Sequence, residues 1–281
     1  MKASKISWPL ILILIVLAGC AGGPDIRPYE GTGYMTEDEE RRLGYYVDAE
    51  VTNQFLTVRN KELIEAVAEI GNRLTAVSHR PNLKYSFKVL NSSMVNAFAG
   101  PGGYVYVTTG LLGELESRDE LAAVLAHEIG HVTARHSIRA LRSANIANTA
   151  LTIIQIIAAL GAAAAGVPAT GDLATLTSYL TTLIIFQGYS RAYESQADRL
   201  GIQYMMRAGY NPRAMISVFE KFIRMREEEG NKEKLVILSS HPALEDRIKE
   251  AKDYIAKLER EGLPPLEQVL DKGEKEDERF R

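Results

Sequence analysis

The chain contains 281 residues, a length that allows one large domain or two small ones. Hydrophobic residues at 46% and charged residues at 25% are ordinary values for a globular protein. The formal net charge of −3 gives no reason to expect a nucleic-acid partner, and the single cysteine excludes a disulfide within the chain.

The first 19 residues have the layout of a secretory signal. Lys2 and Lys5 precede an aliphatic run, Leu10–Leu17, which is too short to be a stable membrane span. Small residues then lead to Cys20, as in the processing site that bacterial lipoproteins carry. We therefore expect Cys20 to be lipidated, the alternative being an uncleaved N-terminal anchor helix. By the same resemblance, Ala21 predicts the periplasmic face of the outer membrane.

Composition divides the remaining chain into a tether, a folded domain and a tail. Residues 20–35 are rich in Gly and Pro, residues 36–261 carry periodic apolar patterns, and residues 262–281 predict a disordered charged tail. Thr36, followed by four acidic residues, predicts the capped start of a helix. A second predicted helix, Lys61–Val77, has one apolar stripe.

Three short runs with β character follow these helices. They cover Tyr85–Leu90, Val95–Ala99 and Tyr104–Thr108, and a Gly- and Pro-rich turn joins the last two. We expect a small antiparallel sheet next to the following helix. An exposed edge strand could hold an extended peptide, although the sheet could equally serve only to cover the helix.

The stretch Leu121–His136 is predicted to form a single apolar helix, and it contains the motif His127-Glu128-x-x-His131. Residues four apart lie on the same helix face, so both imidazoles can reach one Zn²⁺ ion. Glu128 lies one step round the helix, where it can take a proton from a water molecule on the metal. The alternative is a buried helix that happens to carry two histidines.

An apolar stretch, residues 143–187, follows and contains Asp172 as the only charged side chain between Arg142 and Arg191. We expect a helical hairpin that is buried in the domain or lies over it. The alternative is a hairpin that enters lipid or a membrane-protein partner. Its many Thr and Ala residues make it only weakly hydrophobic for a membrane core.

A further helix is predicted from about Ser190, and it carries Glu194 and Asp198 on one face. Two small residues, Ala197 and Gly201, permit close packing against another helix. A catalytic zinc site needs three protein ligands and an open fourth position, so Glu194 can be the third ligand. Asp198 could then accept a hydrogen bond from a ligating imidazole, although solvated charge is the simpler explanation of such a pair.

The last predicted helix is amphipathic and bears Leu244, Ile248, Ala251, Ile255 and Leu258 on one stripe. His241 lies just before it, where the ring can point into a cleft. The alternative is that His241 is a simple capping residue.

Three motifs in this order make residues Glu37–Leu258 similar to metallopeptidase family 48: His127-Glu128-x-x-His131, Glu194-x-x-x-Asp198 and Ser240-His241-Pro242. The resemblance implies a gluzincin-like α+β fold that is predominantly α-helical, with a small antiparallel sheet beside the motif helix. It implies one Zn²⁺ ion held by His127, His131 and Glu194, with Glu128 as general base.

The resemblance also implies roles for residues outside these motifs. His241 would stabilise the transition state or occupy the zinc as a gate, and Arg247 matches a family arginine near the site. The predicted substrate-binding strand comprises Asn96, Ala97, Phe98 and Ala99.

The function implied is that of a zinc-dependent endopeptidase of the bacterial cell envelope, which acts on polypeptides in protein quality control. The main alternative is a periplasmic chaperone or assembly factor with a latent or gated zinc site, which the apolar stretch favours. A purely structural zinc site would need a fourth ligand. His136 is predicted to point to another helix face, which leaves His241. We expect neither the several membrane helices of prenyl proteases nor a tetratricopeptide-repeat domain, because the sequence after the His241 helix is short.

Overall fold

The computed structural model describes residues 35–143, 188–228 and 235–264, together with residues 178, 181, 182 and 185. The predicted signal and its Cys20, the tether, most of the apolar stretch and nearly all of the charged tail lie outside the described residues. Within the described part, no helix is long and apolar enough to span a membrane.

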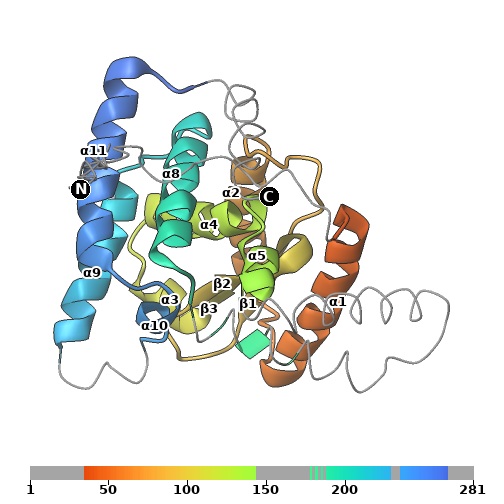
Figure 1. The fold of residues 1–281 in the computed structure, drawn as a ribbon. Helices are drawn as coiled ribbons and strands as arrows, with labels where there is room; N and C mark the ends of the chain where they lie inside the picture. Colours follow the sequence, from red (N-terminus) through yellow and green to blue (C-terminus); the bar gives the residue numbers. More distant parts are fainter. Residues whose placement is uncertain are drawn as a thin grey trace, which may run out of the picture.

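The described chain is mostly helical and carries one small sheet (Figure 1). The first half contains α1 (Glu37–Gln54), α2 (Lys61–Thr75), β1 (Ser86–Leu90), β2 (Ala97–Ala99), the 3₁₀ turn η1 (Pro101–Gly103), β3 (Tyr104–Thr108) and α3 (Thr109–Glu114). The second half contains α4 (Arg118–Thr133), α5 (His136–Ser143), α8 (Arg191–Arg207), α9 (Ala214–Glu227), α10 (Ile237–Ser240) and α11 (Leu244–Glu261). This confirms the predicted α+β class.

The sheet has the strand order β1-β3-β2 and is mixed rather than wholly antiparallel. β2 and β3 form the antiparallel pair expected from the short turn between them, whereas β1 lies parallel to β3. The chain leaves β1, crosses to the far side of β3 to form β2, and returns through η1, so β3 runs in the direction of β1. Residues 56–58 bond to β1 along its other edge, which leaves β2 as the outer strand on the opposite side.

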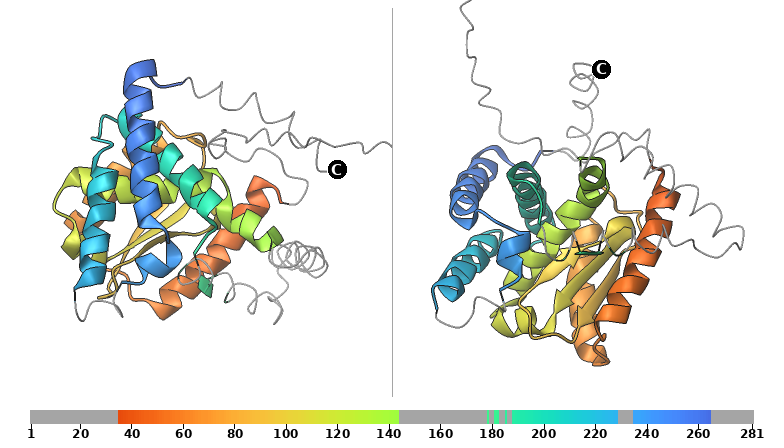
Figure 2. Two further views of the ribbon diagram at one scale, coloured as in Figure 1. Left: turned by 60° about the vertical axis from the view of Figure 1, so that its left-hand side comes forward. Right: turned by 60° about the horizontal axis from the view of Figure 1, so that its bottom comes forward.

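Alternation along the strands gives the sheet two apolar faces. Phe98 and Tyr106 pack with α1, whereas Val105 and Val107 belong to the core formed with α2, α4, α8, α9 and α11. α1 therefore lies on one side of the sheet, and α2, α4, α8, α9 and α11 lie on the other (Figure 2). This packing holds α4, the helix with the metal motif, directly against the sheet.

The prediction of one continuous helix from Leu121 to His136 is wrong. α4 ends at Thr133, Arg135 adopts a left-handed conformation with φ of 55°, and α5 begins at His136. Arg135 is held there by its side chain, which contacts the Glu40 carboxylate at 2.9 Å and the Met35 carbonyl at 2.8 Å. These contacts with distant residues end the helix, and a local pattern cannot reveal them.

Glycine lets α4 and α8 approach closely. A Cβ atom on Gly130 would lie 2.7 Å from the carbonyl oxygen of Ala197, and one on Gly201 would lie 3.1 Å from the His127 backbone nitrogen. The small residues of both helices therefore set the distance between them, as expected for Ala197 and Gly201. That distance decides whether side chains of α4 and α8 can bind one metal ion together.

Candidate metal centre

Two helices supply the first three members of a buried polar group. His127 and His131 stand one turn apart on α4, and their Nε2 atoms are 2.9 Å apart. Glu194 of α8 places one carboxylate oxygen 3.4 Å from the Nε2 of His127 and the other 3.3 Å from the Nε2 of His131. The carboxylate thus spans both histidines across the close helix interface.

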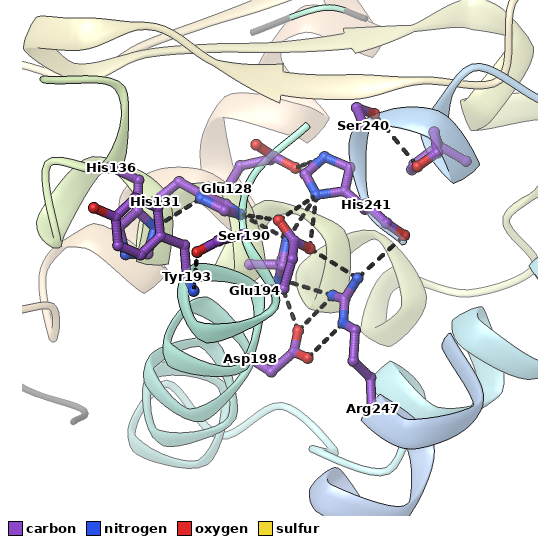
Figure 3. A network of polar contacts seen from close by, with 12 residues as sticks. Glu128, His131, His136, Ser190, Tyr193, Glu194, Asp198, Ser240, His241 and Arg247 are labelled. Atoms are coloured by element: carbon purple, nitrogen blue, oxygen red, sulfur yellow. Dashed lines mark hydrogen bonds and ion pairs between the residues drawn. The ribbon is translucent and has the colours of Figure 1, made fainter. Parts of the chain in front are cut away.

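His241, which follows α10, completes this group (Figure 3). Its Nδ1 atom lies 3.0 Å from Glu194 and 3.1 Å from the Nε2 of His127. The potential ligand atoms of His127, His131, Glu194 and His241 all lie within 4.8 Å of one another, and all four side chains are buried.

Asp198 and Arg247 support the group from one side. Asp198 accepts a hydrogen bond from the Nδ1 of His127 at 2.8 Å, so the Nε2 atom of His127 is the one that faces the other potential ligands. Arg247 of α11 donates to both oxygens of Asp198 at 2.7 Å and lies 2.8 Å from Glu194. The structure therefore places Arg247 against the two carboxylates, where it holds both in position.

Glu128 is buried beside the group, but it is poorly paired. One oxygen lies 3.5 Å from the Nε2 of His241, and the other has no hydrogen-bond partner among the described residues. Burial raises the pKa of this carboxyl group above its ordinary value. Glu128 is therefore a carboxyl group that can hold and release a proton, with one of its oxygens left unpaired among the described residues.

The protonation of the group follows from burial and charge together. Burial lowers the pKa of His131 to about 3, although Glu194 opposes this. Burial also disfavours a charged His127, but hydrogen bonds to Asp198 and Glu194 prevail and raise its pKa to about 9. The pKa of Glu194 is held well below its ordinary value, against the effect of burial, by His241 and Arg247. A cation that binds here would displace a proton from His127.

The donor set fits a divalent metal ion. Imidazole nitrogens and a carboxylate oxygen meet at one buried point, and the backing contact from Asp198 orients one ring for ligation. Two imidazoles and a carboxylate are the ligands that zinc takes in catalytic sites, although the same set can bind other divalent ions.

The structure also shows residues that the sequence did not indicate. His136 contacts the side of His131 that faces away from Glu194. One of its ring nitrogens lies 2.8 Å from the Nδ1 of His131 and the other lies 2.8 Å from Gln196. The Tyr189 ring stacks on His131 with centroids 4.3 Å apart. The sequence predicts that His136 points to another helix face, and this differs from the structure because the pattern does not reveal the helix break at Arg135. The sequence signal for its role is that His136 is the third histidine within ten residues, after His127 and His131.

The predicted substrate strand is the last strand on one side of the sheet, and all of its residues are buried. Asn96 and Gly100 bond to β3, so the alternation of an antiparallel pair directs the backbone groups of Ala97 and Ala99 away from it. The Asn96 side chain instead bonds to the Ile185 carbonyl at 3.2 Å.

An apolar cleft adjoins the metal group. Its polar lining comprises His127, Glu128, His241 and Arg247. The remaining wall includes Val124 of α4, Met215, Phe219 and Phe222 of α9, and Leu244 of α11.

Histidines and a glutamate from two neighbouring helices, converging at one point with a second glutamate alongside, define a metallopeptidase-type centre. Comparison with known sequences agrees with this class. The model of peptidase family M48 matches residues 62–255, more than half of the chain, and the chain therefore belongs to peptidase family M48.

Curated relatives include proteases from bacteria and yeast. The chain is 32% identical over 232 residues to the putative beta-barrel assembly-enhancing protease of Vibrio cholerae, covering 82% of this chain and 46% of that protein. It is 28% identical over 240 residues to the beta-barrel assembly-enhancing protease of Escherichia coli K12, covering 83% and 48%. Identity to the mitochondrial metalloendopeptidase OMA1 of Schizosaccharomyces pombe is 32% over 198 residues, covering 69% and 54%. The chain spans about half the length of these relatives.

Proposed function

We propose that this protein is a zinc-dependent endopeptidase. The observation that carries the proposal is the convergence of His127, His131 and Glu194 beside Glu128, whose outer oxygen has no partner in the described structure. Membership of a peptidase family and relatives named as metalloendopeptidases support it.

In this proposal His127, His131 and Glu194 hold the zinc ion, which would supply Lewis acidity for hydrolysis. Glu128 takes a proton from the attacking water as the water oxygen bonds to the scissile carbonyl carbon. As the C–N bond breaks, Glu128 delivers that proton to the leaving amine. The raised pKa of Glu128 suits both transfers, because the protonated form is less unfavourable in a buried site.

We propose that the substrate binds as an extended chain along the edge of β2. The outward backbone groups of Ala97 and Ala99 would pair with it, and the apolar cleft would receive a hydrophobic side chain next to the scissile bond. A peptide library should then show an apolar preference at one position beside the cleaved bond. Phe222→Ala should shift that preference towards larger side chains, and an unchanged profile would contradict this use of the cleft.

We further propose that the protein acts in the cell envelope in protein quality control, anchored to the outer membrane by lipid on Cys20. The names of the bacterial relatives and the lipoprotein-like N-terminus support this location. Labelling with a radioactive fatty acid, followed by fractionation of wild type and Cys20→Ser, tests it. Label and membrane association that survive in Cys20→Ser would refute the anchor.

Metal content provides the first test of the whole proposal. Purified wild-type protein should contain about one zinc ion per chain, as a three-ligand catalytic site does. Glu194→Ala should lose it while remaining folded. A folded wild-type protein that takes up no zinc would remove the basis for an endopeptidase.

A second candidate function is a chaperone or assembly factor with a closed zinc site. It is favoured by the position of His241, whose nitrogen lies close enough to act as a fourth ligand. Four protein ligands would leave no open position for catalysis. His241→Ala separates the possibilities, because proteolysis should rise if His241 closes the site and fall if His241 assists the reaction.

A further inference from the structure

We propose that His136 is a positioning residue that fixes the tautomer and orientation of His131, so that the Nε2 of His131 is always free to bind the metal. The inference rests on the metal-binding part of the proposed function. It concerns a hydrogen-bond chain that runs from Arg139 through Gln196 and His136 to His131.

Arg139 determines which atom donates and which accepts at each step of this hydrogen-bond chain. The Gln196 Oε1 atom lies 2.9 Å from an Arg139 guanidinium nitrogen and 2.8 Å from the Nε2 of His136. A guanidinium only donates hydrogen bonds, so the amide atom that faces it must be the oxygen. That oxygen then accepts from His136 as well, which places a hydrogen on the Nε2 of His136.

The next bond transmits this assignment to the metal ligand. His136 is fully buried, and its ring nitrogens contact a neutral amide and another imidazole, so the uncharged ring is the favourable form. With hydrogen on Nε2, its Nδ1 is an acceptor. That atom lies 2.8 Å from the Nδ1 of His131, which must donate to it. The Nε2 of His131 is therefore left as a lone pair directed at Glu194 and His127.

Aromatic contacts hold both rings in this arrangement. His136 stacks on Tyr193 with centroids 4.4 Å apart and planes 7° apart, and the Arg139 guanidinium covers Tyr193 at 4.5 Å. Tyr189 stacks on His131. These contacts fix the plane of each imidazole, and the bond from Arg139 to the Gln196 oxygen fixes the direction of the hydrogen-bond chain.

The two ligating histidines of α4 are thus supported differently. A carboxylate, Asp198, orients His127, whereas a neutral imidazole orients His131. The hydrogen bond from His131 to His136 adds no charge to a buried site that already contains three carboxylates. It depends on the helix break at Arg135, which brings His136 back towards α4.

Zinc affinity of the purified full-length protein tests the role, measured by competition with a chromophoric chelator. His136→Phe keeps a ring against Tyr193 but removes the acceptor, and zinc binding should weaken about 10- to 100-fold. His136→Asn can offer an amide oxygen where Nδ1 lies and should stay close to wild type. His79→Phe, at a largely buried histidine outside the group, is the matched control and should leave zinc affinity unchanged.

Wild-type affinity in His136→Phe, or equal loss in His136→Phe and His136→Asn, would overturn the proposal. Nitrogen-15 NMR of the histidine rings in zinc-free wild type needs no variant. It should show His131 with its hydrogen on Nδ1 and His136 with its hydrogen on Nε2, and the opposite assignment would refute the chain. Failure of wild type to bind zinc would instead refute the proposed function, and the tautomers would still decide this inference.

Discussion

Glu40 and Glu128 are equally buried, each with 1% of its surface exposed, but their surroundings are opposite. Glu40 accepts hydrogen bonds from Arg80 at 3.0 and 3.1 Å and from the Gly102 backbone at 3.2 Å, and it pairs with Arg135 at 2.9 Å. Glu128 has one contact at 3.5 Å, to His241, and a second oxygen without a partner in the described structure.

The difference separates a carboxylate that is fully paired within the fold from one that is left partly unpaired. A buried charge is costly unless it is paired and hydrogen-bonded. Glu40 meets that requirement and ties α1 to the turn at η1 and to the end of α4. Glu128 does not, and such exceptions to the packing rules concentrate at functional sites.

Glu128→Gln should cause the largest change. If Glu128 transfers protons, casein hydrolysis should fall about 10²- to 10⁴-fold, because an amide cannot accept the proton. Zinc content and thermal stability should remain those of wild type, since no strong contact is removed. Retention of proteolysis would show that the unpaired oxygen is not the general base.

Glu40→Gln should have the converse effect. Without the Glu40 carboxylate, Arg80 and Arg135 lose a charged partner in a buried site. The free energy of unfolding should therefore fall by about 3–5 kcal/mol. Urea denaturation measures this, while the zinc content of the protein that remains folded should not change. A stability equal to that of wild type would mean that pairing at Glu40 contributes little.

Gly130→Ala tests whether the close approach of α4 and α8 is needed for the metal group. The added Cβ would meet the Ala197 carbonyl at 2.7 Å, so the helices must separate, at a cost of about 1–3 kcal/mol in the free energy of unfolding. Zinc affinity should fall at the same time. Gly113→Ala is the control, because a Cβ there meets nothing within 4 Å. Equal behaviour of the two variants would rule out this steric account.

His79 is a half-buried, incompletely paired group away from the metal group, and its effect should be the smallest. Its Nδ1 bonds to the Tyr204 hydroxyl at 2.7 Å, its Nε2 has no partner in the described structure, and burial together with Arg207 lowers its pKa to about 4. The folded pKa lies below the unfolded value of 6.5, so this contribution is complete above pH 6.5 and is lost as pH falls towards 4.

We expect this loss to amount to about 1–2 kcal/mol after allowance for partial exposure. Unfolding free energies of wild type and His79→Phe, measured between pH 7 and 4, should differ in slope over that window. Parallel curves would show that His79 is not protonated on unfolding, and zinc affinity should be the same in both proteins.

Local patterns predicted the elements that depend on nearby residues. Thr36 caps α1 through a reciprocal bond with Glu39, as the acidic run after it indicated. β3 has the predicted bounds, and α8 begins directly after Ser190. Helix geometry places residues four positions apart on one face. This applies to His127 and His131 and to Glu194 and Asp198.

The amino-acid sequence by itself therefore indicated α1, α2, α8, α11 and the three strands, and which side chains could reach a metal ion. Only the tertiary structure decided that β1 runs parallel to β3, that α4 stops before His136, and that Arg247 holds both Glu194 and Asp198. Each of these depends on contacts between residues far apart in the chain, such as Arg135 with Glu40. Short-range periodicity carries no information about such contacts, because it records only which residues share a face of their own helix or strand.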